Sequence, residues 1–185
     1  MAYQLFLDTE FTDLSRPEFL SAGLVAVSHT PGLPDRELYL CIDPLPLEKC
    51  SEFVVAQVLP QIHLPCGCPI VKGSRAELGV ALIKFLDSFS QARVEIVSDF
   101  VGDFRVLEQL LVKNNRQFPG FSIHYRMVSD VLPYAFAAPT NYLNKSRELL
   151  NTPDTAHPGV RAHHSLFDAR CMAKAVQYTH LRASY

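Results

Sequence analysis

The sequence has no excess of positive charge: 17 lysines and arginines stand against 19 aspartates and glutamates in 185 residues, a formal net charge of −2 at pH 7. A protein that binds polyanions tightly and without specificity usually carries a strongly basic surface. The composition therefore argues against such a binder. It argues less against an enzyme that contacts only the last few nucleotides, because bound metal ions supply positive charge locally.

Internal repeats, a cysteine framework and long apolar runs are also lacking. The five cysteines are scattered and odd in number, so no disulfide scaffold is expected. The opening MAYQLFLDTE has no basic stretch and is interrupted by two acids, unlike a signal peptide or a membrane anchor. No apolar run approaches the length of a membrane span. We expect a soluble, cytoplasmic protein with no membrane contact, in which residues 1–185 form a single domain.

The chain changes character along its length, from strand-like to alternating patterns. The predicted strands, in chain order, are 3–7, 22–28, 37–42, 94–97 and 126–131. The predicted helices are 52–58, 75–89 with Ser74 as N-cap, one with an apolar face from Phe104 to Leu111, 142–150 and about 165–180. Three antiparallel strands followed by alternating helices and strands predict an α/β domain with a mixed sheet.

Two acids end the first predicted strand. Asp8 and Glu10 stand two residues apart in FLDTEF, so both side chains are expected on one face of the sheet. Like charges on one face repel and are costly to bury unless a cation lies between them. The pair suggests a divalent metal, although two exposed acids at a strand end are an ordinary alternative.

Two further acidic segments each open a predicted helix. VSDFVGDF places Asp99 and Asp103 between a strand and the next helix, where acids also act as ordinary caps. HHSLFDA places His163 and His164 just before Asp168, in the first turn of the last predicted helix. A capping serine followed by a first-turn acid would explain that segment without any function. Each segment taken by itself is unspecific.

In this order, the three segments resemble the DEDD superfamily of 3′–5′ exonucleases, in the subgroup with a catalytic histidine (DEDDh), which includes RNase T and oligoribonuclease. The family's Asp-x-Glu motif matches Asp8 and Glu10, and the aspartate that opens the helix after strand four matches Asp103. The third motif, His-x-Ala-x-x-Asp, matches His163 and Asp168. The resemblance covers nearly the whole chain. It implies an RNase H-like fold with three antiparallel strands, then parallel strands, and flanking helices.

Two positions depart from the family pattern. Asp99 stands four residues before the second-motif aspartate, where the family commonly has a small polar residue, so either acid could reach a metal; the spacing favours Asp103. Ser165 replaces the usual alanine of the third motif. Two histidines precede that motif's aspartate, and the family spacing selects His163, whereas His164 is expected at the surface or as a cap.

The resemblance implies phosphodiester hydrolysis with two Mg²⁺ or Mn²⁺ ions, which all-oxygen ligands favour over Zn²⁺. Asp8 is expected to bridge both ions, with Glu10, Asp103 and Asp168 completing their ligand shells. His163 is expected to act as general base on the attacking water, since an imidazole can accept a proton at neutral pH.

The implied substrate is the 3′ end of RNA or of single-stranded DNA, and the resemblance also implies a homodimer. Thr9, within the first motif, and Phe11, directly after it, are candidate substrate contacts; in relatives an aromatic near this point stacks on a terminal base. Strict strand alternation would instead turn Phe11 away from the site. Two other functions stay open: an inactive RNase H-like binding or scaffold module, and a metal-dependent phosphatase acting on small molecules.

The segment HLPCGC holds three residues that bind zinc in other proteins. His63, Cys66 and Cys68 are not followed by a second ligand pair, which a structural zinc site usually needs. A plain loop with buried thiols is the favoured interpretation.

Overall fold

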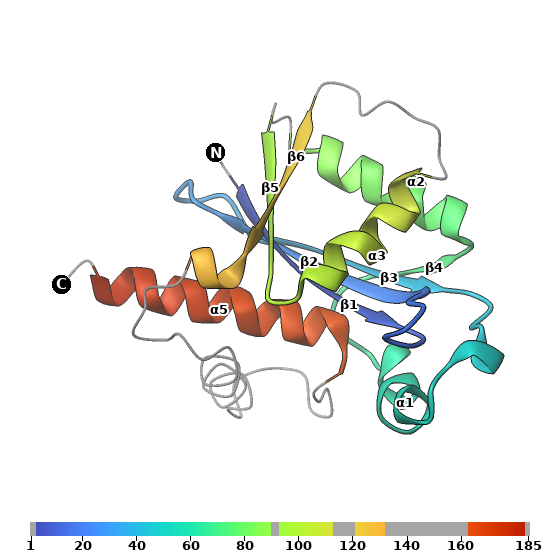
Figure 1. The fold of residues 1–185 in the computed structure, drawn as a ribbon. Helices are drawn as coiled ribbons and strands as arrows, with labels where there is room; N and C mark the ends of the chain where they lie inside the picture. Colours follow the sequence, from blue (N-terminus) through green and yellow to red (C-terminus); the bar gives the residue numbers. More distant parts are fainter. Residues whose placement is uncertain (1–2, 90–92, 113–120, 132–162, 184–185) are drawn as a thin grey trace.

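A six-stranded mixed sheet forms the centre of the computed structural model, which describes residues 3–89, 93–112, 121–131 and 163–183 (Figure 1). The order across the sheet is β4-β3-β2-β1-β5-β6. The strands are β1 (Tyr3–Phe11), β2 (Phe19–Ser28), β3 (Arg36–Ile42), β4 (Ile70–Gly73), β5 (Arg93–Ser98) and β6 (Ser122–Met127). Strands β1 to β3 are antiparallel, whereas β5 and β6 run parallel to β1, and β4 runs parallel to β3. The predicted α/β fold with a mixed sheet is confirmed.

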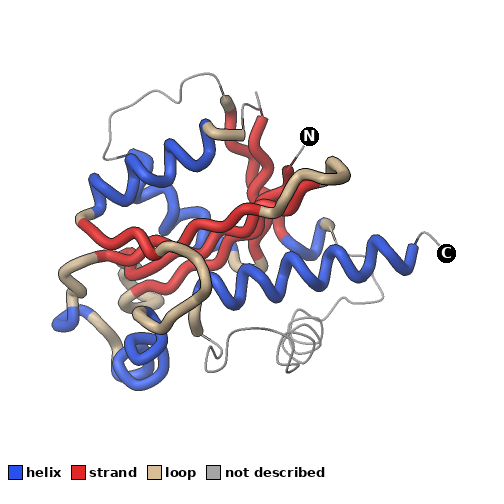
Figure 2. Tube along the Cα trace, turned by 180° about the vertical axis from the view of Figure 1, so that it is seen from behind, coloured by secondary structure: helices blue, strands red, loops and turns tan. Residues whose placement is uncertain are grey.

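Helices cover both faces of this sheet. Helices α2 (Arg75–Asp87) and α3 (Val101–Val112) pack on one face, and α5 (Ser165–Ala183) runs across the other. Figure 2 shows the same layering from behind, with a small helical lobe beside the end of the sheet. That lobe contains a five-residue π-helix, Val54–Val58, followed by α1 (Leu59–Ile62). Two 3₁₀ turns, Leu47–Lys49 and Val128–Asp130, complete the described elements.

The predicted start of α2 is confirmed in detail. Ser74 Oγ accepts a hydrogen bond from the Glu77 backbone N–H, and the Glu77 carboxylate accepts one from the Ser74 N–H. This reciprocal capping box satisfies two N–H groups that a helix start leaves without an intrahelical partner.

One predicted strand is misplaced, and one strand was not predicted. The strand expected at 126–131 is β6, which lies earlier; the chain then turns into a 3₁₀ helix. As an edge strand, β6 carries exposed polar residues such as Ser122 and His124, which weakened its apolar signal. Strand β4 was not expected, because its four residues are too few to show a periodicity. The helix expected at 142–150 lies outside the described residues.

The first turn of α5 rests directly on β2. A Cβ added to Gly23 would lie 2.2 Å from the Cα of Leu166, so only glycine allows this close approach. The buried hydroxyls of Ser21 and Ser165 lie 3.0 Å apart and satisfy each other. The helix start is thereby fixed next to the end of β1, where the acids are. No helix in the described ranges is both long and apolar enough to cross a bilayer.

Candidate active site

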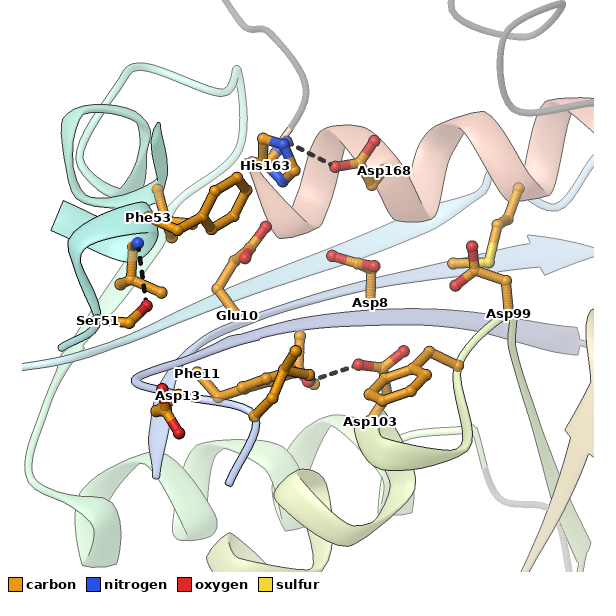
Figure 3. A pocket seen from close by; sticks show the side chains of 16 residues that line it. Asp8, Glu10, Phe11, Asp13, Ser51, Phe53, Asp99, Asp103, His163 and Asp168 are labelled. Atoms are coloured by element: carbon orange, nitrogen blue, oxygen red, sulfur yellow. Dashed lines mark hydrogen bonds between the residues drawn. The ribbon is translucent and has the colours of Figure 1, made fainter. Parts of the chain in front are cut away.

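A pocket of about 470 Å³ opens where β1, the β5–α3 junction and the start of α5 meet (Figure 3). All five acid and histidine positions proposed from the motifs lie in it: Asp8, Glu10, Asp103, His163 and Asp168. Asp99, Thr9 and Phe11 line it as well. Residues separated by as many as 160 positions in the sequence are therefore brought together.

Strand alternation sets the directions of the first-motif side chains. Asp8 and Glu10 point toward α5, as Figure 3 shows. Thr9, between them, has its hydroxyl on Asp103, donating to Oδ1 at 2.7 Å. Thr9 thus holds an acid in place, a contact that the sequence did not reveal.

Asp103 is fixed by two hydroxyl groups. Thr9 donates to its Oδ1, Ser98 donates to its Oδ2, and its side chain is 1% exposed. Hydrogen bonds from hydroxyl groups favour the ionised form of the carboxylate. They also fix the orientation of the Asp103 side chain, but they supply no positive charge. Its neighbour Asp99, in the loop that follows β5, is less buried and also reaches the pocket.

The acids form two clusters that share one member. Oxygen atoms of Asp8, Glu10 and Asp168 lie within 4.8 Å of one another, and so do oxygens of Asp8, Asp99 and Asp103. Carboxylate oxygens are the ligands that Mg²⁺ and Mn²⁺ prefer. The donor set of each cluster therefore suits such an ion, and Asp8 belongs to both clusters.

The pocket is crowded with negative charge. Burial raises the pKa of Asp8 well above its usual value, and the charges of Asp103, Asp168, Glu10 and Asp99 raise it further. Burial, with Asp168 and Asp103, raises the pKa of Glu10 to about 8.

The pKa of Asp103 rises less, to about 7. Burial raises it, and the hydrogen bonds from Ser98 and Thr9 oppose that rise. No lysine or arginine is among the described residues that line the pocket. A bound cation is therefore what would stabilise the ionised acids.

His163 has an unusual backbone conformation. Its φ is 69°, in the left-handed region that non-glycine residues rarely adopt. Its backbone N–H donates to Asp168 Oδ2 at 2.9 Å, and the Asp168 N–H donates to the His164 carbonyl at 3.0 Å. These two bonds stabilise the turn that presents the His163 ring to the pocket. The Phe53 ring meets it edge-on, with centroids 5.2 Å apart.

The expected surface position of His164 is wrong, although the residue does stand directly before α5 at the cap position. Its ring is fully buried and stacks on Tyr39, with centroids 4.5 Å apart. Burial lowers its pKa to about 4, so the ring is neutral at physiological pH. Because α5 starts directly against the sheet, the residue before its first turn is enclosed rather than exposed.

Phe11 lines the pocket despite strict alternation. The β1–β2 register shifts between Glu10 and Phe11, so Phe11 pairs with Phe19 and the alternation is broken there. Its ring stacks with that of Phe100, with centroids 6.1 Å apart and planes 26° apart.

Phe100 was missed by sequence reasoning. Phe100 lines the pocket and is 43% exposed. Its ring packs against Gly102, where an added Cβ would lie 2.1 Å from the nearest ring atom. The position of Phe100 in the sequence, between Asp99 and Asp103, could have indicated that it lies at the pocket. Leu14 and Phe53, 77% and 56% exposed, add further apolar surface around the opening.

The possible zinc ligands lie outside this pocket. Among the described residues, His63 does not join Cys66 and Cys68 in a three-ligand cluster, although the two sulfur atoms lie 3.4 Å apart.

Neither a family model nor a curated protein matches this sequence. Solved structures do match. A 3′-exonuclease described for 3′-end-specific recognition of the histone mRNA stem-loop has a TM-score of 0.63 at 13% identity, over 96% of this chain and 63% of that one. The chain thus spans less than two thirds of that protein's length.

Two further structures are covered almost completely. The nuclease domain of 3′hExo, a DEDDh family member bound to rAMP, has a TM-score of 0.58 at 14% identity, over 98% of this chain and 92% of that one. Exonuclease X, in complex with 5′-overhanging duplex DNA, has a TM-score of 0.54 at 13% identity, over 98% and 93%. The expected fold, that of the DEDDh 3′-exonucleases, is confirmed.

Proposed function

We propose that this chain, which has the fold of the DEDDh 3′-exonucleases, is a metal-dependent 3′–5′ exonuclease that removes nucleotides from RNA or single-stranded DNA. One observation carries the proposal: two clusters of carboxylates share Asp8 and lie beside His163 in one pocket. A single fold can host many functions, so the residues of the pocket, and not the fold, indicate the activity.

The acids are suited to holding two divalent cations. Asp8, Glu10 and Asp168 would hold one ion, and Asp8 with Asp103 and Asp99 the other. Two such ions, Mg²⁺ or Mn²⁺, would relieve charge on the scissile phosphate and lower the pKa of the attacking water. Both Asp103 oxygens already accept hydroxyl hydrogen bonds, so we assign Asp99 a direct share of the second site.

His163 would take the proton from the attacking water. Its ring lines the pocket, and the Phe53 ring restricts its rotation. The backbone bond to Asp168 ties the position of the base to an acid of the first cluster. General-base catalysis of this kind contributes about 10²–10⁴-fold to a rate.

The aromatic side chains would bind the terminal bases. Phe11 and Phe100 form a partly exposed stacked pair at the pocket. A base can stack on an aromatic ring only when its own face is free, so this contact favours unpaired 3′ ends. Stacking is tolerant of sequence, which suits an enzyme that removes successive nucleotides. A homodimer and a cytoplasmic location stay predictions.

The test uses matched RNA and DNA oligonucleotides, labelled at the 5′ end and incubated with Mg²⁺, Mn²⁺ or a chelator. We expect a ladder that shortens stepwise from the 3′ end and disappears with the chelator. A binding module would retain the oligonucleotide without shortening it. A phosphatase would release phosphate from small substrates and leave the chain length unchanged, and either outcome would refute the proposal.

A further inference from the structure

A pair of thiols lies away from the acidic pocket, in the loop between α1 and β4. Cys66 and Cys68 flank Gly67, whose φ of 76° is in the left-handed region. This turn curls the loop so that the two sulfur atoms lie 3.4 Å apart. They need to approach by only about 1.4 Å more to reach bonding distance.

Arg170 anchors this loop to α5. Its Nε and Nη2 donate to the Glu37 carboxylate at 2.7 and 2.5 Å, and Nη2 also donates to the Cys66 carbonyl oxygen at 2.7 Å. The Arg170 side chain is 13% exposed, so the guanidinium is a largely buried charge beside the thiols. The sequence had suggested only an ordinary loop here.

The surroundings favour a reactive sulfur. The hydrogen bond from Cys68 and the charge of Arg170 lower the pKa of the Cys66 thiol to about 6 against the opposing effect of burial. The thiolate is the nucleophilic form of cysteine. The same hydrogen bond and burial raise the pKa of Cys68, so Cys68 keeps its proton. Cys66 is buried, but the Cys68 side chain that contacts it is partly exposed, so the pair lies within reach of a small oxidant.

We infer that Cys66 and Cys68 form a reversible thiol–disulfide site that a peroxide oxidises to an intrachain disulfide. The Cys66 thiolate first attacks hydrogen peroxide and becomes a sulfenic acid, and the displaced hydroxide takes up a proton to leave as water. The Cys68 thiol then attacks the Cys66 sulfur, forming the S–S bond and displacing the hydroxyl, which leaves with the Cys68 proton as a second water. Two S–H bonds are lost, and the two electrons and two protons reduce one peroxide to two waters. A thiol reductant reverses the reaction.

Cys41 is the competing partner for Cys66. It is buried on β3, its thiol donates to the Ile62 carbonyl at 3.5 Å, and burial raises its pKa to about 12. The Cys41 thiol is thus held on a backbone carbonyl, whereas the Cys68 sulfur already lies 3.4 Å from that of Cys66, and this proximity favours the Cys66–Cys68 pairing.

The test treats fully reduced protein with equimolar hydrogen peroxide and measures the intact mass, followed by alkylation and peptide mapping. We expect the loss of two hydrogen atoms, with Cys66 and Cys68 protected from alkylation and both recovered after dithiothreitol. Cys68→Ser, at the partly exposed position, should abolish the loss, and Cys66→Ser should do the same.

Cys41→Ser and Cys50→Ser are the matched controls and should still lose two hydrogens. The inference is refuted if the wild type only gains oxygen, if Cys68→Ser still forms the bridge, or if Cys41→Ser abolishes it. A circular dichroism melt of Cys68→Ser checks that the variant is folded. The outcome is independent of the proposed nuclease, because the readout is a mass and not an activity.

Discussion

Buried and half-buried carboxylates occur in two kinds of surroundings in this molecule. On β3 and β5, each comes with a cationic side chain: half-buried Glu37 binds Arg170 through two hydrogen bonds, and Glu95, 7% exposed, accepts from Arg126 at 3.3 Å and from Gln4 at 3.2 Å. Such pairs are part of the scaffold, because each charge is compensated within the chain.

The pocket acids are held differently. Asp103 is fixed by hydroxyls of Thr9 and Ser98, and its neighbours are other acids. With no lysine or arginine among the described lining residues, the negative charge remains for an external cation. A carboxylate thus stabilises the fold in one place and costs stability in the other, and this difference distinguishes the scaffold acids from the acids that we propose bind metal.

Replacing Asp8 by asparagine should give the largest effect. It removes the acid common to both clusters, so hydrolysis should fall by about 10³-fold or more, the equivalent of several kcal/mol of lost metal stabilisation. The melting temperature of the metal-free protein should rise, because one repelling charge is gone. Labelled-oligonucleotide assays and thermal melts measure both. An Asp8→Asn variant that still hydrolyses substrate would show that the pocket acids do not differ from the scaffold acids in binding a catalytic metal.

Loss of the proposed general base, His163, should slow turnover without weakening metal binding by the acids. His163→Ala should slow hydrolysis by about 10²–10⁴-fold while Mn²⁺ binding, measured by calorimetry, is kept. His29→Ala, at an exposed histidine near the end of β2, is the control and should act like the wild type. Near-normal turnover of His163→Ala would show that the base is another group.

Phe100→Ala tests whether the apolar rim binds substrate. Loss of a stacking contact worth about 1–3 kcal/mol should raise KM for a single-stranded oligonucleotide by about 5- to 150-fold, with kcat little changed. Val101→Ala removes a neighbouring exposed side chain that does not line the pocket and is the matched control. Equal KM values for the two variants would exclude Phe100 from substrate binding.

Replacing the scaffold acid Glu37 should have the opposite effect to replacing Asp8: stability should fall and activity should be kept. Glu37→Gln leaves the largely buried Arg170 without its counter-charge, which should cost about 2 kcal/mol, between the ranges for exposed and fully buried pairs. The melting temperature should fall by about 4–8 °C, and kcat should be unchanged. Lys49→Gln, which breaks the more exposed pair with Glu18, should cost under about 1 kcal/mol. A Glu37→Gln variant as stable as the wild type would contradict this assignment.

The pH dependence of the metal-free protein tests the pocket acids without any substitution. The pKa of Glu10 is raised to about 8 and that of Asp103 to about 7, so above pH 5 the folded state keeps protons that the unfolded chain releases. Stability should therefore fall as pH rises from 5 to 8. Saturating Mn²⁺ should flatten this slope in thermal melts, as should Glu10→Gln. A flat profile without metal would mean that the acids are neutralised in some other way.

The sequence predicted the site correctly wherever a residue's position along a strand or helix determines the direction of its side chain. The spacing of Asp8 and Glu10 on a strand predicted their convergence, and motif order predicted that Asp103 and Asp168 would join them. Side-chain contacts between different strands and helices could not be predicted from the sequence. The Thr9–Asp103 bond spans 94 positions, and no local pattern indicates it.

Local irregularities account for the remaining errors. The register shift after Glu10 turned Phe11 into the pocket, against the alternation that the sequence suggested. Packing of α5 against Gly23 enclosed His164, which the sequence had suggested to be a surface or capping residue. Both depend on how closely two distant backbones approach, which is a property of the folded chain.

Anomalous diffraction from crystals grown with Mn²⁺ tests the central claim most directly. We expect two manganese peaks in the pocket, both within bonding distance of Asp8, one also beside Glu10 and Asp168 and the other beside Asp99 and Asp103. A pocket with no manganese, or with peaks that Asp8 does not contact, would contradict the claim that these acids are gathered to bind cations.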